Sequence, residues 1–127
     1  MTYSIKQVSE QTGLRPHVLR FYEKEGLLPG VGRTHSGIRT YSQEDIDWLG
    51  LVCCLKNTGM SLKQIREFVD LSLQGGETLA ERCEMLELHR AAILCQLEQM
   101  QLHLKKVDEK IDHFSAQQAE YERSHAM

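Results

Sequence analysis

The stretch PHVLRFYEKEGLLPG, residues 16–30, decides the fold of this 127-residue chain. Its proline stands where a helix would begin, a position that tolerates proline because the N–H it lacks would have no partner there. Apolar side chains then recur with a helical period as far as Lys24, and Gly26 ends the pattern. These residues predict a short helix over about 16–24.

A second short helix is predicted just before it. Ser4 and Gln7 form a Ser-x-x-Gln capping signal, and Ile5 and Val8 lie on one face of the segment that follows. Gly13 ends this segment. Two short helices joined by a tight glycine-containing turn predict a helix-turn-helix over about residues 4–24.

Residues 27–41 are predicted to form a wing. The alternation in Ile38-Arg39-Thr40-Tyr41, after a Ser-Gly turn, indicates a short strand and therefore a small hairpin. The glycines of this region do not build a phosphate-binding P-loop, because the Gly-Lys-Ser/Thr ending is missing. Two further capped helices are expected within residues 42–73, so the first domain is predicted to span residues 1–74.

One long amphipathic helix is predicted over residues 77–121, followed by a tail at 122–127. Its apolar seam recurs at alternating spacings of four and three, which is a heptad pattern, and only Arg90 breaks it. The seam consists of Leu79, Cys83, Leu86, Ile93, Leu97, Met100, Leu104, Val107, Ile111 and Phe114. A lone helix cannot bury such a seam, so we expect a dimeric coiled coil; packing against the first domain is the alternative.

The net charge of −3 conceals two oppositely charged parts. Residues 1–41 hold six basic and three acidic side chains, a charge of +3, and the remaining nine basic and fifteen acidic side chains give −6. This asymmetry suggests a unit that binds a polyanion and a separate association unit. Ordinary solvated surface charge is the alternative explanation.

The four cysteines and the absence of a secretory segment favour a reducing compartment, so we expect a cytoplasmic protein. Adjacent Cys53 and Cys54 do not suggest a disulfide framework. No stretch approaches the roughly 18 apolar residues of a membrane span, and we expect no membrane association.

A dimeric helix-turn-helix reads two half-sites of double-stranded DNA, with its second helix in the major groove. On that helix His17 and Arg20 are predicted to lie away from the apolar face and reach the DNA, and Tyr22 to bind a phosphate. Arg33 and Arg39 of the wing are predicted to clamp the DNA backbone.

The stretch LRFYEKEGLLP (residues 19–29), then Arg33, then SGIRTY (residues 36–41), resembles the signature of the MerR family of bacterial transcription regulators. The resemblance covers roughly the first 70 residues and the long helix. It implies a mainly α fold, a winged helix-turn-helix DNA-binding domain followed by a long dimerisation helix forming an antiparallel coiled coil.

The same resemblance implies a homodimer that binds an inverted repeat inside a promoter. The spacer between the two elements of such a promoter is too long for RNA polymerase to engage both. Such regulators underwind and bend the DNA so that RNA polymerase engages both promoter elements. Carried over position by position, the DNA contacts fall on His17, Arg20, Tyr22, Arg33, Arg39 and Tyr41. The chain departs from the pattern at two positions: several relatives carry Lys in place of His17, and many carry Tyr in place of Ile38.

The stretch CLKNTGMSL, residues 54–62, resembles the branch of the family that responds to aldehydes and other thiol-reactive electrophiles, the AdhR- and NmlR-like regulators. The characteristic cysteine of that branch matches Cys54. A thiolate attacks such electrophiles, and positive charge at Lys56 or Arg66 would lower its pKa. Cys53 shares a face with Ile46 and Leu49 and is expected to be a packing residue.

Other signals and functions are considered as alternatives. A metal-responsive regulator is the first, although Cys83 lies inside the seam and His89, His103 and His113 are too far apart to form a site within one helix. We expect no bound metal, no cofactor, no separate drug-binding domain and no enzymatic activity. A coiled-coil adaptor without a DNA role is the remaining alternative.

Overall fold

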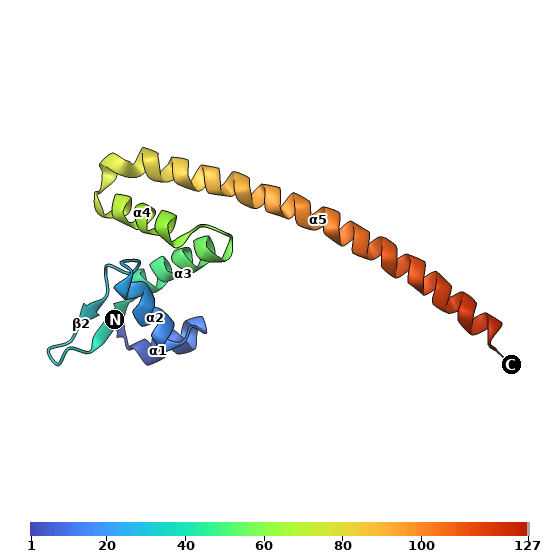
Figure 1. Cartoon of the computed structure of the whole chain (residues 1–127). Coiled ribbons are helices and arrows are strands. Elements are labelled where there is room, and N and C mark those ends of the chain that lie inside the picture. Colours follow the sequence, from blue (N-terminus) through green and yellow to red (C-terminus); the bar gives the residue numbers. More distant parts are fainter. Residues whose placement is uncertain (127) are drawn as a thin grey trace. The chain divides into compact units, whose positions relative to one another are not determined.

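The computed structural model describes residues 1–126 and is mainly helical (Figure 1). The chain divides into two compact units, the first spanning Met1–Leu86 and the second beginning at Glu87. Each unit is described separately below. This architecture confirms the mainly α fold with a helix-turn-helix, a small wing and a long C-terminal helix.

The helix-turn-helix begins with α1, Ile5–Thr12, and continues with α2, Pro16–Lys24. Ser4 caps α1 by accepting a hydrogen bond from the Gln7 backbone N–H, while the Gln7 side chain accepts one from the Ser4 backbone N–H. Gly13 ends α1 in the left-handed conformation with φ of 76°, which glycine adopts without steric cost. The capping box and Gly13 therefore bound α1 as predicted, and a tight turn leads from it to α2.

The wing belongs to a three-stranded sheet with the order β1-β3-β2. Strands β2, Gly32–Arg33, and β3, Arg39–Ser42, form the expected hairpin. Strand β1, Thr2–Tyr3, was not expected; it pairs antiparallel with β3, placing Tyr3 opposite Tyr41. This pairing joins the N-terminus to the wing.

Helices α3, Gln43–Asn57, and α4, Leu62–Leu73, complete the first unit. Ser42 and Ser61 cap them through the same reciprocal box that opens α1. The apolar sides of α1 to α4 and the sheet bury one core. Its fully buried members include Val8, Leu19, Leu27, Leu49, Val52, Ile65 and Val69.

A short 3₁₀ turn, Gly76–Thr78, connects α4 to the last helix. Thr78 is buried, and its hydroxyl donates to the Leu71 carbonyl oxygen at 2.5 Å. Arg82 donates to the Gly75 carbonyl oxygen at 2.8 Å. The segment from Gly75 to Thr78 is thus a hydrogen-bonded corner, and the first compact unit continues through it to Leu86.

Helix α5, Leu79–Ser124, is continuous over 46 residues. The predicted tail at 122–127 is helical up to Ser124, and its last residue, Met127, lies outside the described residues. No helix in residues 1–126 is long and apolar enough to cross a membrane.

Candidate nucleic-acid interface

An open hollow of about 500 Å³ lies between α2 and the wing in the first unit. It is lined by His17, Arg20, Phe21, Glu23, Lys24, Arg33 and Arg39. Four of these side chains are permanently cationic, and only one is acidic. A concave surface with this balance concentrates positive potential, which suits a polyanion.

The helical geometry of α2 explains how its cations come together. His17, Arg20 and Lys24 are spaced at i, i+3 and i+7, so they share one face of the helix. Leu19 and Tyr22, on the opposite face, are buried in the core and fix the orientation of the helix. The packing of one face therefore presents the other face, with its cations, to the hollow.

The wing adds two arginines from neighbouring strands. Arg33 on β2 stands directly opposite Arg39 on β3 in the antiparallel register. Like charges directly opposite one another destabilise a strand pair unless a counter-charge lies between them. Glu23 of α2 supplies that counter-charge.

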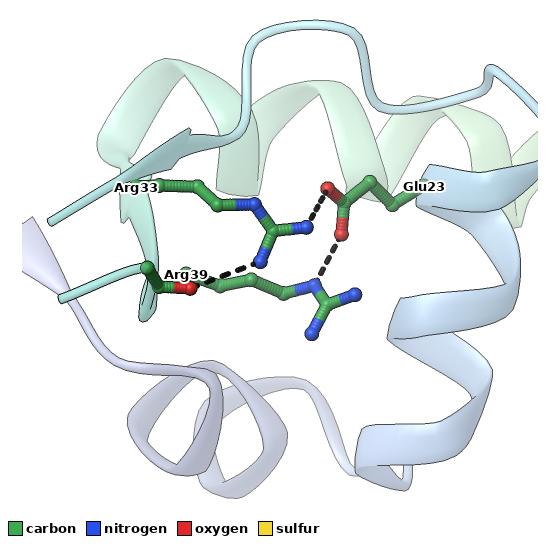
Figure 2. A network of polar contacts seen from close by, with 4 residues as sticks. Glu23, Arg33 and Arg39 are labelled. Carbon is green, nitrogen blue, oxygen red and sulfur yellow. Dashed lines mark hydrogen bonds and ion pairs between the residues drawn. The ribbon is translucent and has the colours of Figure 1, made fainter.

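Figure 2 shows the Glu23 carboxylate between the two guanidinium groups. Its Oε1 accepts from Nη2 of Arg33 at 3.1 Å, and its Oε2 pairs with Nε of Arg39. Nη1 of Arg33 donates in addition to the Gly37 carbonyl oxygen at 3.2 Å. One carboxylate therefore links the second helix of the helix-turn-helix to both strands of the wing.

The two tyrosines predicted to contact DNA lie in the core. Tyr22 is 3% exposed and Tyr41 is 1% exposed. Lys56 Nζ donates to the Tyr22 hydroxyl at 3.4 Å, and the Tyr41 hydroxyl is buried without a hydrogen-bond partner among the described residues. Burial leaves both side chains little surface for DNA, and the contacts predicted for them stay predictions.

Tyr41 lies beneath the charged hollow. Burial raises the pKa of the Tyr41 phenol, and the negative charge of Glu23 raises it further, while Arg39, Arg20 and Arg33 oppose the shift. The phenol therefore stays neutral at physiological pH.

Sequence reasoning missed Phe21, Glu23 and Lys24. Phe21 is an apolar residue of the predicted helix, yet it is exposed and lines the hollow beside Arg20. The signal was available, because 17, 20, 21 and 24 form one helical face. Glu23 could not be found in this way, because its partners lie 10 and 16 residues further along the chain.

Comparison with known proteins identifies this architecture. A sequence model described as "MerR HTH family regulatory protein" matches residues 3–71, and one described as "MerR, DNA binding" matches residues 46–106. The chain belongs to the MerR family of transcriptional regulators. It is a DNA-binding MerR-type transcriptional regulator, and its relatives are transcriptional regulators.

Two MerR family relatives and one solved structure are particularly similar. An uncharacterised regulator of Haemophilus influenzae is 40% identical over 87% of this chain and 82% of its own. The regulator AdhR of Bacillus subtilis is 38% identical over 72% of this chain and 65% of its own. The crystal structure of HiNmlR, a MerR family regulator lacking the sensor domain and bound to promoter DNA, matches with a TM-score of 0.88, 39% identity and 94% coverage of both chains.

The long helix of this MerR family chain carries an exposed apolar seam. None of the α5 side chains is buried. Large apolar side chains of the seam lie in solvent within the single chain: Leu79, Leu86, Leu97, Met100, Leu104, Val107, Ile111 and Phe114. Exposed apolar surface of this extent marks an interaction site, because a monomer gains nothing from leaving it in water.

The adjacent cysteines on α3 have different environments. Cys54 is exposed, whereas Cys53 is half-buried against the core. Burial raises the pKa of the Cys53 thiol, an effect that the Lys56 charge and a hydrogen bond with Tyr22 only partly offset. Lys56 contacts Tyr22, and Arg66 pairs with Glu25 at 2.7 Å. Both cations expected near Cys54 thus have other contacts.

No group of three or more His, Cys, Asp or Glu side chains within residues 1–126 has the arrangement of a metal site.

Proposed function

We propose that this MerR family regulator binds an inverted-repeat promoter site as a homodimer, with α2 of each protomer in the major groove. The hollow between α2 and the wing carries this proposal, because it gathers His17, Arg20, Arg33 and Arg39 on one concave face. The likeness to a family member described as bound to promoter DNA supports it.

The residues of the hollow have different roles in this proposal. Arg20 and His17 project from the helix that enters the groove, where an arginine pairs with a guanine edge or a phosphate. Arg33 and Arg39 come from the wing and hold phosphates, which positions the protein without reading the sequence. Lys24 adds a further cation from α2.

Fluorescence anisotropy with DNA from the protein's own upstream region tests the interface. One arginine contact is worth about 1–3 kcal/mol, and a dimer makes it twice, so Arg20→Ala is expected to weaken binding at least about 30-fold. Arg123→Ala, which removes a cation from α5 outside the hollow, is the matched control and should bind like the wild type. Equal affinities for Arg20→Ala and the wild type would contradict the proposed interface.

The exposed seam of α5 supports the homodimer, and Arg90 favours an antiparallel arrangement. In a parallel dimer each seam residue faces itself, so Arg90 would face a second Arg90 inside the apolar seam. In an antiparallel dimer Arg90 instead lies opposite another seam residue of the partner helix, and the two Arg90 side chains are apart. Separating the two like charges removes a repulsion that the parallel dimer retains.

The regulatory step in this proposal is a change in DNA twist. The dimer holds its two half-sites at a fixed separation, and underwinding the promoter between them aligns its two elements for RNA polymerase. In vitro transcription with purified polymerase and promoters of different spacer length tests this step. We expect stimulation at the natural spacer and loss of stimulation when the spacer is shortened by two base pairs.

The proposed sensor of the inducing signal is Cys54. Its exposed position gives an electrophile access that the half-buried Cys53 lacks. The thiolate attacks the carbonyl carbon of an aldehyde, forming a C–S bond, and the carbonyl oxygen takes a proton from water to give a hemithioacetal. The stretch of residues 54–62 that resembles the AdhR- and NmlR-like branch supports an electrophile as the signal, and AdhR itself is 38% identical over 72% of this chain.

The two cysteines provide matched variants for this test. Cys54→Ser is expected to abolish induction by an aldehyde in a promoter-reporter strain while leaving operator binding intact, and Cys53→Ser should retain induction. Full induction of the Cys54→Ser variant would exclude this thiol as the sensor. Induction by a divalent metal ion but by no aldehyde would favour the metal-responsive alternative.

A further inference from the structure

We propose that Glu23 is a positioning residue that sets the specificity of DNA binding by orienting the two wing arginines. This inference rests on the proposed function, because it assumes that Arg33 and Arg39 hold DNA phosphates. An acidic side chain in a DNA-binding hollow repels the ligand, so its presence there requires a compensating contribution. The geometry of Figure 2 supplies one.

The carboxylate holds both arginines at once. Its two oxygens take different partners, Nη2 of Arg33 and Nε of Arg39, and it is only 20% exposed, so its position is fixed by its surroundings. Arg33 is additionally held by the Gly37 carbonyl oxygen within the wing turn. The rotamers of two long side chains are thereby restricted before DNA arrives, which lowers the entropy cost of binding.

The arginines keep enough donors for a phosphate. A guanidinium has five N–H donors. Arg39 uses only Nε on Glu23, and its two terminal nitrogens make no hydrogen bond among the described residues. Those nitrogens are the forked pair that binds a phosphate bidentately. Glu23 therefore holds Arg39 through Nε and leaves its forked terminal pair available to the DNA backbone, while Arg33 keeps its Nε and one N–H on each terminal nitrogen.

This role predicts opposite effects on two kinds of DNA. Glu23→Gln keeps the size of the side chain but removes two negative charges per dimer. Non-specific DNA, which is bound mainly through its charge, should bind more tightly. Operator DNA is held in one register and in the underwound shape proposed above, which needs both wing arginines in fixed positions, so its binding should weaken. We expect the ratio of specific to non-specific affinity to fall at least tenfold.

Two further variants isolate the positioning role. Glu25→Gln removes a carboxylate two residues away that pairs with Arg66, outside the wing; it should leave the specificity ratio within about twofold of the wild type. Glu23→Asp keeps the charge but shortens the side chain, so it cannot bridge both arginines. It should weaken operator binding without strengthening non-specific binding.

The experiment is an anisotropy titration of wild type and the three variants against upstream DNA and a scrambled duplex, with the arginine Nε–H resonances recorded by NMR. The Arg39 Nε–H signal should be slow to exchange in the wild type and in Glu25→Gln, and lost in Glu23→Gln. Parallel rises or parallel falls on both DNAs in Glu23→Gln would overturn the positioning role. Absence of wild-type binding to either DNA would instead overturn the proposed function.

Discussion

At the residue scale, the buried side chain of Tyr41 leads to a prediction about the stability of the protein. Its side chain packs beneath the wing arginines, and its hydroxyl lacks a hydrogen-bond partner among the described residues. A buried hydroxyl left unpaired costs about 1–3 kcal/mol relative to one that is hydrogen-bonded. This cost suggests a substitution that removes the hydroxyl and leaves the ring in place.

We predict that Tyr41→Phe stabilises the protein by about 1 kcal/mol, because it removes the unpaired hydroxyl without creating a cavity. Urea denaturation followed by circular dichroism measures the change. Tyr3→Phe is the control, since the exposed Tyr3 hydroxyl makes only a long 3.4 Å hydrogen bond to Gln43, and it should change the stability little. Operator affinity should be the same in wild type and Tyr41→Phe; a large loss would support Tyr41 as a DNA contact.

A second prediction at this scale concerns the salt dependence of Arg33. If Arg33 binds a phosphate, Arg33→Ala removes two phosphate contacts per dimer. The slope of log affinity against log salt concentration should then become less steep by about 2. Anisotropy titrations between low and physiological salt measure the slope, and an unchanged slope would exclude a phosphate contact by this side chain.

The same residues show what sequence could predict at this scale. The cations of α2 were predictable because helical spacing alone places His17 and Arg20 on one face. The burial of Tyr22 and Tyr41 was not, because it depends on how α2 and β3 pack against the rest of the core. Glu23 was missed for a related reason: its partners are brought to it only when the wing folds back onto α2.

At the scale of elements, local signals fixed the helices. Three serine capping boxes mark the starts of α1, α3 and α4, and each was readable over four residues. Strand β1 has only two residues and no pattern of its own, so it became visible only through its pairing with β3. Short strands are defined by their partners, whereas capped helices are defined by their own sequence.

The seam of α5 leads to a prediction at the same scale. Leu104 lies on the seam and Leu102 does not, yet their exposed fractions in the single chain are similar, 57% and 62%. Leu104→Glu places a charge inside the proposed interface twice per dimer and should convert the protein to a monomer at micromolar concentration. Leu102→Glu, the control, should stay dimeric.

Sedimentation velocity distinguishes the two variants. If both remain dimeric, the heptad seam is not the interface. If both become monomeric, the face of α5 used for association is wider than the seam.

At the scale of the whole molecule, DNA binding by the helix-turn-helix depends on the proposed dimerisation through α5. A single helix-turn-helix contacts only one half-site, and a dimer doubles the contacts while fixing their separation. The net charge of −3 conceals the basic DNA-binding part and the acidic remainder, because their charges of +3 and −6 partly cancel. The fold and the family could be predicted from the sequence, because they depend on local signals and a long motif. The dimer depends on contacts with a second chain, and the sequence of one chain gives only the seam that would form them.

Sedimentation equilibrium of the wild-type protein with its own upstream duplex tests the central claim most directly. We expect two chains per duplex at saturation, with an affinity that falls steeply between low and physiological salt. Replacing one half-site of the inverted repeat should weaken binding strongly, because only one helix-turn-helix of the dimer then meets its site. One chain per duplex, or binding that does not change with salt, would contradict a dimeric regulator that holds DNA through its cationic hollow.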